Sequence, residues 1–182
     1  MKKVLVVVDM QNDFIDGALG TPQAQAIVDK VCEKIRNWDG AVAYTMDTHT
    51  PSSYPSTTEG KDLPVPHCMT GSDGWQLNSM VFDAIRKRNR HADDMRYLCY
   101  EKECFGSFNL ACDLCTRFDY IEVIGLCTDV CVISNAVLLR NFNECVEVVV
   151  DASCCAGVTP EKHRIALEAM KGCGIHVVND EM

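Results

Sequence analysis

Residues 4–8 read Val-Leu-Val-Val-Val, and this β-branched run stops at Asp9. A short, continuous apolar run is typical of a strand that is buried on both faces, as the strands of a parallel sheet are. Similar runs recur along the chain and alternate with segments whose apolar residues have helical spacing. This alternation predicts one α/β domain over residues 1–182, with three layers and a mostly parallel sheet of about six strands.

The same criteria place five further strands after the first run. We expect them at residues 41–46, 97–100, 121–126, 146–150 and 175–178. Between them we expect helices around 80–85, through Leu110 and Leu114, and over 132–139. Two more helices begin at Thr21-Pro22 and Thr159-Pro160, where an N-cap residue precedes a proline in the first turn.

One segment does not follow the alternation. Thr48 to Trp75, about 27 residues, is rich in Pro, Ser, Thr and Gly. Loops of that length are uncommon in compact domains unless they serve a function. We therefore expect this segment to contribute to a functional site.

Charge and composition exclude several classes of function. The chain has 182 residues, 47% of them hydrophobic, with 26 acidic and 17 basic side chains and a net charge of −9. A negative surface disfavours binding of nucleic acid or of an anionic membrane. The basic run at residues 86–91 fits the end of a helix, where cations are common.

Twelve cysteines would indicate a disulfide framework in a secreted chain. Residues 1–8 contain just five consecutive apolar residues before Asp9, too few for an export signal. Several cysteines lie in apolar segments, where a free thiol behaves as a small core residue. We therefore expect a cytoplasmic protein with reduced thiols.

Three residues that can carry chemistry follow predicted strands. Asp9, Lys102 and Cys131 stand at or beyond the carboxyl ends of three strands, where open α/β sheets bind ligands. They suit a cysteine nucleophile, its base and a cation. Cys131 would lie in the first turn of a helix, which we expect to lower the pKa of its thiol. The alternative is a capping acid, a solvated lysine and a core cysteine.

A second set of residues suits a metal ion. Asp47 and His49 are two apart at the end of a strand and therefore project to one side. The long segment adds His67, followed by Cys68 as a competing ligand. Two imidazoles and a carboxylate suit Zn²⁺, Fe²⁺ or Mn²⁺ and leave positions open for water or substrate. Ordinary surface-loop residues are the alternative interpretation.

Five motifs together resemble the isochorismatase-like cysteine hydrolase superfamily, and within it most closely the nicotinamidases. They are Val-Val-Val-Asp-Met-Gln-Asn-Asp-Phe at 6–14, Asp-Thr-His at 47–49, Pro-Val-Pro-His-Cys at 64–68, Lys102 with Ser107-Phe108, and Gly-Leu-Cys-Thr-Asp-Val-Cys at 125–131. The resemblance covers the whole chain and implies a Rossmann-like sheet. It also implies hydrolysis of nicotinamide to nicotinate and ammonia through a cysteine thioester, as in the salvage of NAD.

The resemblance assigns roles to individual residues. It implies a catalytic triad of Asp9, Lys102 and Cys131. A divalent metal, usually zinc, would be held by Asp47, His49 and His67. The backbone N–H groups of Cys127 and Cys131 would form the oxyanion hole, beside a cis peptide at Leu126-Cys127. Phe14 would line the substrate pocket, and a homo-oligomer would be in keeping with the family.

Two features depart from the nicotinamidase pattern, and one of them is the short segment from Lys102 to Phe108. The other is a missing tryptophan. In many members a tryptophan covers the pyridine ring, and it stands just before the metal-binding histidine. This chain has Leu63, Pro64 and Val65 at those positions. Trp75 is nearby in the sequence. The residue that covers the substrate ring is therefore left open.

Three other functions are alternatives to the nicotinamidase. Isochorismatases lack the cysteine nucleophile, so Cys131 argues against them. N-carbamoyl and ureido amidases keep the triad but usually lack the metal set. A non-enzymatic metal or redox protein would use Cys112 and Cys115, completed by Cys127 or by the pair Cys154-Cys155. No second C-x-x-C pair supports that alternative.

Overall fold

The fold is an open sheet of six parallel strands, seen in a computed structural model that describes residues 1–88 and 98–180. The strand order is β3-β2-β1-β4-β5-β6. The strands are β1 (Lys3–Val8), β2 (Ala41–Asp47), β3 (Cys99–Lys102), β4 (Tyr120–Leu126), β5 (Glu147–Ala156) and β6 (His176–Val178). The predicted α/β class and parallel sheet are confirmed.

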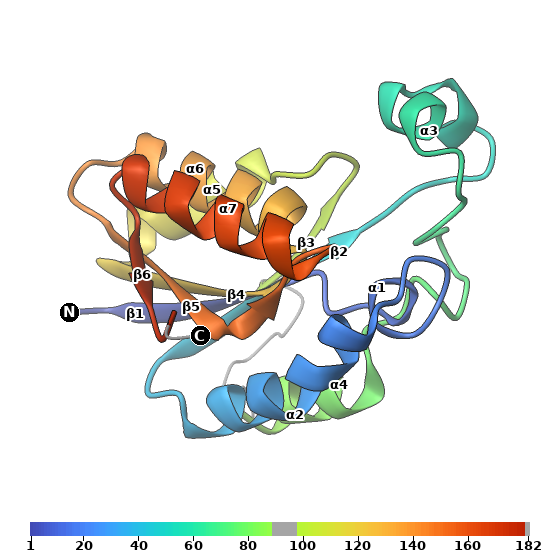
Figure 1. The fold of residues 1–182 in the computed structure, drawn as a ribbon. Helices are drawn as coiled ribbons and strands as arrows, with labels where there is room; N and C mark the ends of the chain where they lie inside the picture. Colours follow the sequence, from blue (N-terminus) through green and yellow to red (C-terminus); the bar gives the residue numbers. More distant parts are fainter. Residues whose placement is uncertain (89–97, 181–182) are drawn as a thin grey trace.

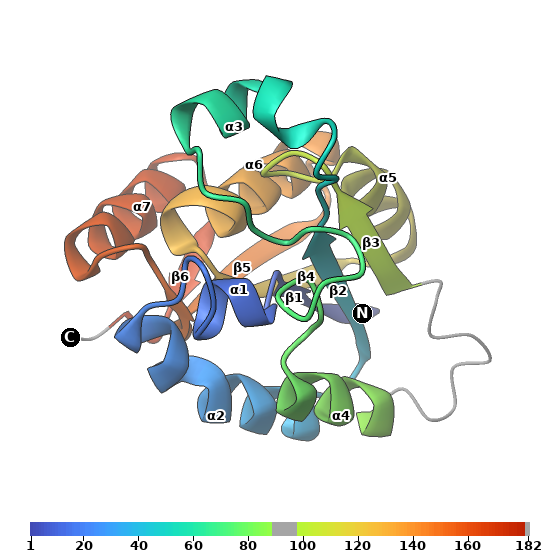
Figure 2. The same cartoon turned by 90° about the vertical axis from the view of Figure 1, so that its right-hand side faces the viewer.

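Helices cover both faces of the sheet and complete the three layers. Helices α2 and α4 lie on one face, and α5, α6 and α7 on the other (Figure 1, Figure 2). Their bounds are α1 (Asn12–Ile15), α2 (Pro22–Asn37), α4 (Ser79–Arg88), α5 (Phe108–Arg117), α6 (Ile133–Phe142) and α7 (Pro160–Gly172). Both predicted Thr-Pro starts are confirmed, because Thr21 accepts a hydrogen bond from the Ala24 amide and Thr159 from the Lys162 amide.

The predicted bounds of two strands were wrong. Strand β3 ends at Lys102 instead of residue 100, and residue 97 lies outside the described residues. Strand β5 continues to Ala156 instead of ending at Val150. The polar residues Asp151 and Ser153 interrupt the apolar run, but small buried residues after them keep the strand against β4.

The centre of the sheet is packed tightly enough to require a glycine. Residues 4–8 of β1 are completely buried. Gly125 of β4 has a φ of +119°, and a Cβ atom there would lie 2.2 Å from the carbonyl oxygen of Val8. Glycine therefore allows β4 to approach β1 at the carboxyl end of the sheet.

The segment between β2 and α4 contains short helices where the sequence predicted a loop. A 3-10 helix (Tyr54–Ser56) is followed by α3 (Thr58–Asp62), which stands beyond the carboxyl end of β2 (Figure 1). The Thr57 side chain caps α3 by accepting a hydrogen bond from the Gly60 amide at 2.9 Å. These helices give the segment local order.

All twelve cysteines are free thiols. In the part of the chain that the structure describes, no helix has both the length and the apolar character needed to cross a bilayer.

Candidate active site

Asp9 and Cys131 meet where the strand order changes direction. The chain proceeds from β1 to β2 and β3 on one side, and then returns to β4 on the other side of β1. Asp9 directly follows β1, and Cys131 lies in a π-helical turn (Thr128–Val132) that follows β4. Such a switch point is the usual ligand site of an open α/β sheet.

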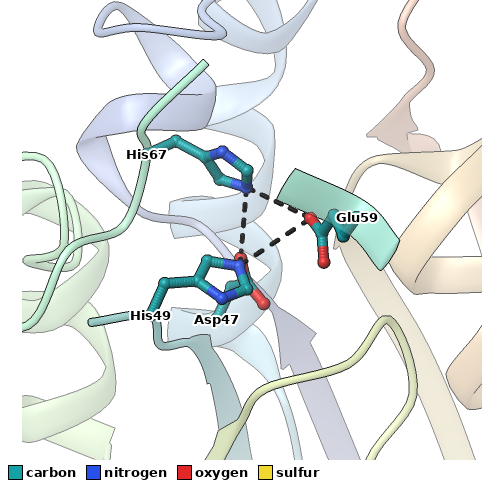
Figure 3. A group of neighbouring side chains, drawn as sticks. All are labelled: Asp47, His49, Glu59 and His67. Atoms are coloured by element: carbon teal, nitrogen blue, oxygen red, sulfur yellow. Dashed lines mark ion pairs between the residues drawn. The ribbon is translucent and has the colours of Figure 1, made fainter. Parts of the chain in front are cut away.

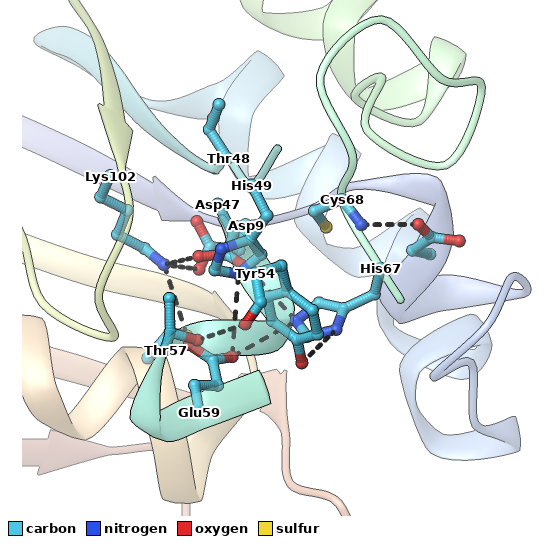
Figure 4. A network of polar contacts seen from close by, with 12 residues as sticks. Asp9, Asp47, Thr48, His49, Tyr54, Thr57, Glu59, His67, Cys68 and Lys102 are labelled. Carbon is cyan, nitrogen blue, oxygen red and sulfur yellow. Dashed lines mark hydrogen bonds and ion pairs between the residues drawn. The ribbon is translucent and has the colours of Figure 1, made fainter. Parts of the chain in front are cut away.

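At this point Lys102 contacts both predicted groups, the pair of Asp9 and Cys131 and the metal-ligand residue Asp47. Its Nζ atom lies 2.7 Å from Asp9 Oδ2 and 3.5 Å from Cys131 Sγ. The same Nζ lies 3.1 Å from Asp47 Oδ1, on the side where the metal-ligand residues gather (Figure 4). All four residues are buried. One buried cation therefore faces two carboxylates and a thiol.

The expected lowering of the Cys131 pKa was wrong. Burial raises the pKa of the Cys131 thiol well above its ordinary value, and the carboxylates of Asp9 and Asp47 add to the increase. Lys102 opposes the increase without overcoming it. Cys131 precedes helix α6, which begins at Ile133 after the π-helical turn. Desolvation of the thiolate thus outweighs the favourable position near a helix N-terminus.

Asp9 is held in a geometry suited to exchanging a proton with the thiol. Burial raises the pKa of Asp9, although Lys102 acts in the opposite direction. Its Oδ1 accepts a hydrogen bond of 2.6 Å from Thr45 Oγ1, and its Oδ2 lies 2.7 Å from Nζ of Lys102, which also contacts Cys131 Sγ. The Asp9 backbone has a φ of 45°, in the left-handed region that aspartate tolerates better than most residues.

Four side chains form a compact group of potential metal ligands (Figure 3). Their nearest ligand atoms all lie within 4.8 Å of one another, and the residues are Asp47, His49, Glu59 and His67. Three of them were predicted from the sequence. The fourth, Glu59, projects from α3 and was missed because a lone glutamate in a polar segment has no distinctive pattern. The cap at Thr57 was the available signal that a helix begins there.

The tautomer of His67 suits metal binding. His67 Nδ1 lies 2.9 Å from the carbonyl oxygen of Val65, so this nitrogen carries the proton. Its other nitrogen, Nε2, faces Asp47 Oδ2 at 3.5 Å and Glu59 Oε1 at 3.4 Å. A histidine whose outer nitrogen donates to a carbonyl is the usual arrangement around a protein-bound metal.

The electrostatics of the group indicate a need for positive charge. Burial opposes ionisation of Asp47, but contacts with His49, His67 and Lys102 outweigh it and lower the Asp47 pKa. Burial also disfavours a charged His67, yet the nearby carboxylates of Asp47 and Glu59 raise its pKa to about 10. His49 Nε2 is buried without a hydrogen bond, 2.9 Å from Asp47 Oδ2. These nitrogen and oxygen donors fit a divalent metal of the zinc type.

Two aromatic residues named in the sequence analysis lie close to this group. The Phe14 ring is buried, and its centre is 5.5 Å from that of His67. Trp75 Nε1 donates a 3.0 Å hydrogen bond to Thr48 Oγ1, between the ligand residues Asp47 and His49. The contact of Phe14 with a substrate remains a prediction.

The turn that carries the thiol has the expected backbone feature. The Leu126–Cys127 peptide is cis. The carbonyl oxygen of Cys127 accepts hydrogen bonds from the amides of Val130 and Val132. The role of the Cys127 and Cys131 amides as oxyanion donors remains a prediction.

The cysteine-cluster alternative receives no support from the described residues. Among them, the group with metal-ligand geometry contains no cysteine. Cys115 is buried and directs its thiol to the carbonyl of Leu139 at 3.5 Å, whereas Cys112 is exposed on the same helix. Residues 86–88 of the basic run end α4 as expected, and residues 89–91 lie outside the described part.

Comparisons with known proteins show a family and several relatives similar over nearly the whole chain. Residues 3–182 match the model of the isochorismatase domain. An uncharacterised isochorismatase family protein of Bacillus subtilis is 31% identical over 180 residues, which cover 92% of this chain and 93% of the relative. A nicotinamidase/pyrazinamidase of Mycobacterium tuberculosis is 27% identical over 188 residues, covering 97% and 98%.

Solved structures share the whole fold. A pyrazinamidase of Pyrococcus horikoshii, solved in complex with zinc, has a TM-score of 0.76 at 27% identity and covers 98% of this chain and 99% of its own. An N-carbamoylsarcosine amidase of Thermoplasma acidophilum has a TM-score of 0.71 at 28% identity, with coverages of 100% and 99%.

Proposed function

This chain belongs to the isochorismatase family, and from that premise we propose that it is a metal-dependent cysteine amidohydrolase that converts nicotinamide and water into nicotinate and ammonia. The contact of Lys102 Nζ with Asp9 at 2.7 Å and with Cys131 Sγ at 3.5 Å is the observation that carries the proposal. It gathers a nucleophile, a base and a cation at the switch point of the sheet. The names of the relatives favour an aromatic carboxamide as substrate.

The first half of the reaction forms a thioester. Asp9 accepts the proton of the Cys131 thiol, and Sγ attacks the carboxamide carbon. The negative charge that develops on the carbonyl oxygen is received by the backbone N–H groups of Cys127 and Cys131. Asp9 then donates its proton to the departing nitrogen, so that ammonia leaves and the acyl group remains on Cys131.

The second half releases the acid. Asp9, again a carboxylate, takes a proton from water as the water oxygen attacks the thioester carbon. The carbon–sulfur bond breaks, and the proton returns to Sγ. Lys102 keeps a positive charge beside Asp9 and Cys131 throughout, which limits the electrostatic cost of each anion.

The metal-ligand group would position the substrate. Asp47, His49, Glu59 and His67 would hold a divalent ion such as zinc, which when bound offers an electron-pair acceptor to the pyridine nitrogen or to a water molecule that orients it. Phe14, packed beside His67, would contact the face of the pyridine ring.

Ammonia release from nicotinamide tests the proposal. Cys131→Ala should abolish turnover in purified, zinc-loaded protein, because no other group on the described part of the chain occupies the place of the thiol. Cys112→Ala, which removes an exposed thiol on α5, is the matched control and should retain activity. Unchanged turnover by Cys131→Ala would contradict the proposal.

An N-carbamoyl or ureido amidase is the second candidate, favoured by the similarity to the N-carbamoylsarcosine amidase. Both reactions use the same triad, and the metal-ligand group separates them. Metal analysis together with an ammonia-release screen over nicotinamide, pyrazinamide, carbamoyl amino acids and ureido acids distinguishes the two. Purified protein that lacks stoichiometric metal and prefers a carbamoyl substrate would support this second candidate.

The cellular setting completes the proposal. Free thiols at all twelve cysteines suit a reducing compartment, and we place the enzyme in the cytoplasm. Fractionation of cells with an antibody against the protein tests this assignment.

A further inference from the structure

Tyr54 touches the metal-ligand group without contributing a ligand to it. Its side chain is 2% exposed, although it lies in the polar segment between β2 and α4. Its ring centre is 4.7 Å from that of His49 and 5.3 Å from that of His67 (Figure 4). The two imidazoles are 5.1 Å apart, so the three rings form one buried cluster.

The hydroxyl of Tyr54 acts on one of these imidazoles. Tyr54 Oη donates a 2.7 Å hydrogen bond to the carbonyl oxygen of Leu63, which uses its one proton. Its lone pairs are then left to face His67 Nδ1 at 3.3 Å. Together with the carbonyl of Val65, this oxygen surrounds Nδ1 with acceptors. The Nδ1–H group is thereby held between two acceptors, and Nε2 is the nitrogen directed at the ligand group.

The backbone of Tyr54 anchors helix α3, which carries the potential ligand Glu59. Its carbonyl oxygen accepts hydrogen bonds from the Thr57 amide at 3.0 Å and from Thr57 Oγ1 at 2.8 Å. Thr57 in turn caps α3, which carries Glu59. A Cβ atom on Gly60 would lie 2.0 Å from the Tyr54 carbonyl oxygen, so α3 starts in close contact with this residue.

We propose that Tyr54 is the positioning residue that sets the metal affinity of the site, by orienting His49 and His67 and by anchoring the segment that carries Glu59. This inference rests on the metal site of the proposed function and is independent of the amidase chemistry. Ligands held in place before binding lose less conformational freedom when the ion arrives. Removing such outer support typically weakens metal binding by about 10–100-fold.

Zinc affinity measured by competition with a chromophoric chelator tests the proposal on the full-length apoprotein. Tyr54→Phe removes the hydroxyl and keeps the ring, and we expect it to weaken zinc binding by about tenfold. Tyr54→Leu also removes the ring, and we expect about 100-fold. The matched control is Tyr120→Phe, which removes a hydroxyl bonded to Glu122 at 2.9 Å and should bind zinc as the wild type does.

Two further readouts separate positioning from a general effect on folding. The visible spectrum of the Co²⁺-substituted protein reports ligand geometry, and it should change in Tyr54→Leu but not in Tyr120→Phe. The far-ultraviolet circular dichroism of each apoprotein should match that of the wild type. Wild-type zinc affinity in both Tyr54 variants would overturn the inference and leave the metal site standing. A wild-type apoprotein that binds no zinc would overturn both, while nicotinamide hydrolysis would be judged by the Cys131→Ala experiment.

Discussion

At the scale of single residues, the proposed triad sets Asp9 and Cys131 beside the one positive charge of Lys102. Burial raises the pKa of both Asp9 and Cys131, so neither group gives up its proton easily. The buried ammonium of Lys102 is the opposing influence on both. Removing the charge of Asp9 or of Lys102 should therefore shift the pKa of the Cys131 thiol in a defined direction.

The first prediction concerns Asp9→Asn. The Asp9 carboxylate raises the pKa of Cys131 by charge repulsion. Its removal should lower that pKa, so alkylation of Cys131 by iodoacetamide near pH 7 should become faster. Hydrolysis should nevertheless fall by about 10²–10⁴-fold, because the group that moves the proton is lost. Peptide mapping by mass spectrometry follows Cys131 separately, and a parallel decrease of both rates would contradict the assignment.

The second prediction concerns Lys102→Met, which should change the pKa of the Cys131 thiol in the opposite direction. Lys102 lowers the pKa of Cys131, so its removal should raise that pKa further and slow alkylation near pH 7. The alkylation rate should recover as the pH rises, since more thiolate then forms. Hydrolysis should fall as well. Faster alkylation in Lys102→Met than in the wild type would exclude a stabilising role for the lysine.

At the scale of secondary-structure elements, a buried ion-pair network fastens α2 to the sheet away from the site. Lys34 of α2 lies 2.8 Å from Asp151 of β5 and also pairs with Glu122 of β4. Both carboxylates are buried. Burial opposes ionisation of Asp151, but Lys34, Asn179 and Ser153 outweigh it and lower the pKa.

The third prediction concerns the stability of the Lys34→Met variant. The substitution should lower the free energy of unfolding by about 2 kcal/mol near pH 7. This loss is smaller than for a fully buried ion pair, because 26% of the Lys34 side chain is exposed. Asp151 has a depressed pKa, so its contribution is present above the ordinary aspartate pKa and is lost as the pH falls through the folded-state value. The difference between wild type and variant should therefore shrink as the pH falls below the ordinary aspartate pKa. Urea unfolding measures it, with Lys171→Met on the surface as the control.

The elements also show which parts of the molecule a sequence can predict. Features with a local sequence signal could be predicted: the strand at residues 4–8, the caps at Thr21 and Thr159, and the proximity of Asp47 to His49 two residues on. Features that depend on tertiary packing could not be predicted. The extension of β5 needs β4 beside it, and Glu59 becomes a potential ligand because α3 turns back over the end of β2. The pKa of Cys131 follows from burial that no helix-terminus argument includes.

At the scale of the whole molecule, the segment between β2 and α4 is joined to the sheet through the potential metal ligands. Asp47 is the last residue of β2 and His49 lies two residues after it, whereas Glu59 and His67 come from farther along the segment. Asp13 on α1 adds a second attachment, because its Oδ2 accepts a 2.7 Å hydrogen bond from the Cys68 amide. Gly74 allows this contact, since a Cβ atom there would lie 2.1 Å from the Asp13 carboxylate. An ion bound by all four ligands would cross-link the segment to the sheet.

The fourth prediction is that zinc stabilises the entire fold. A ligand that binds the native state alone adds about 2.7 kcal/mol at a concentration 100 times its dissociation constant. For a chain of this length, such a gain should raise the Tm of the apoprotein by about 5–10 °C. Differential scanning fluorimetry after chelation, with and without added Zn²⁺, measures the shift. His67→Ala should largely remove it, because it takes away a ligand. Mg²⁺ should raise the Tm less than Zn²⁺, since it prefers an all-oxygen, octahedral site to one with two imidazoles. Equal shifts with both ions, or an undiminished zinc shift in His67→Ala, would place the stabilising ion elsewhere on the molecule.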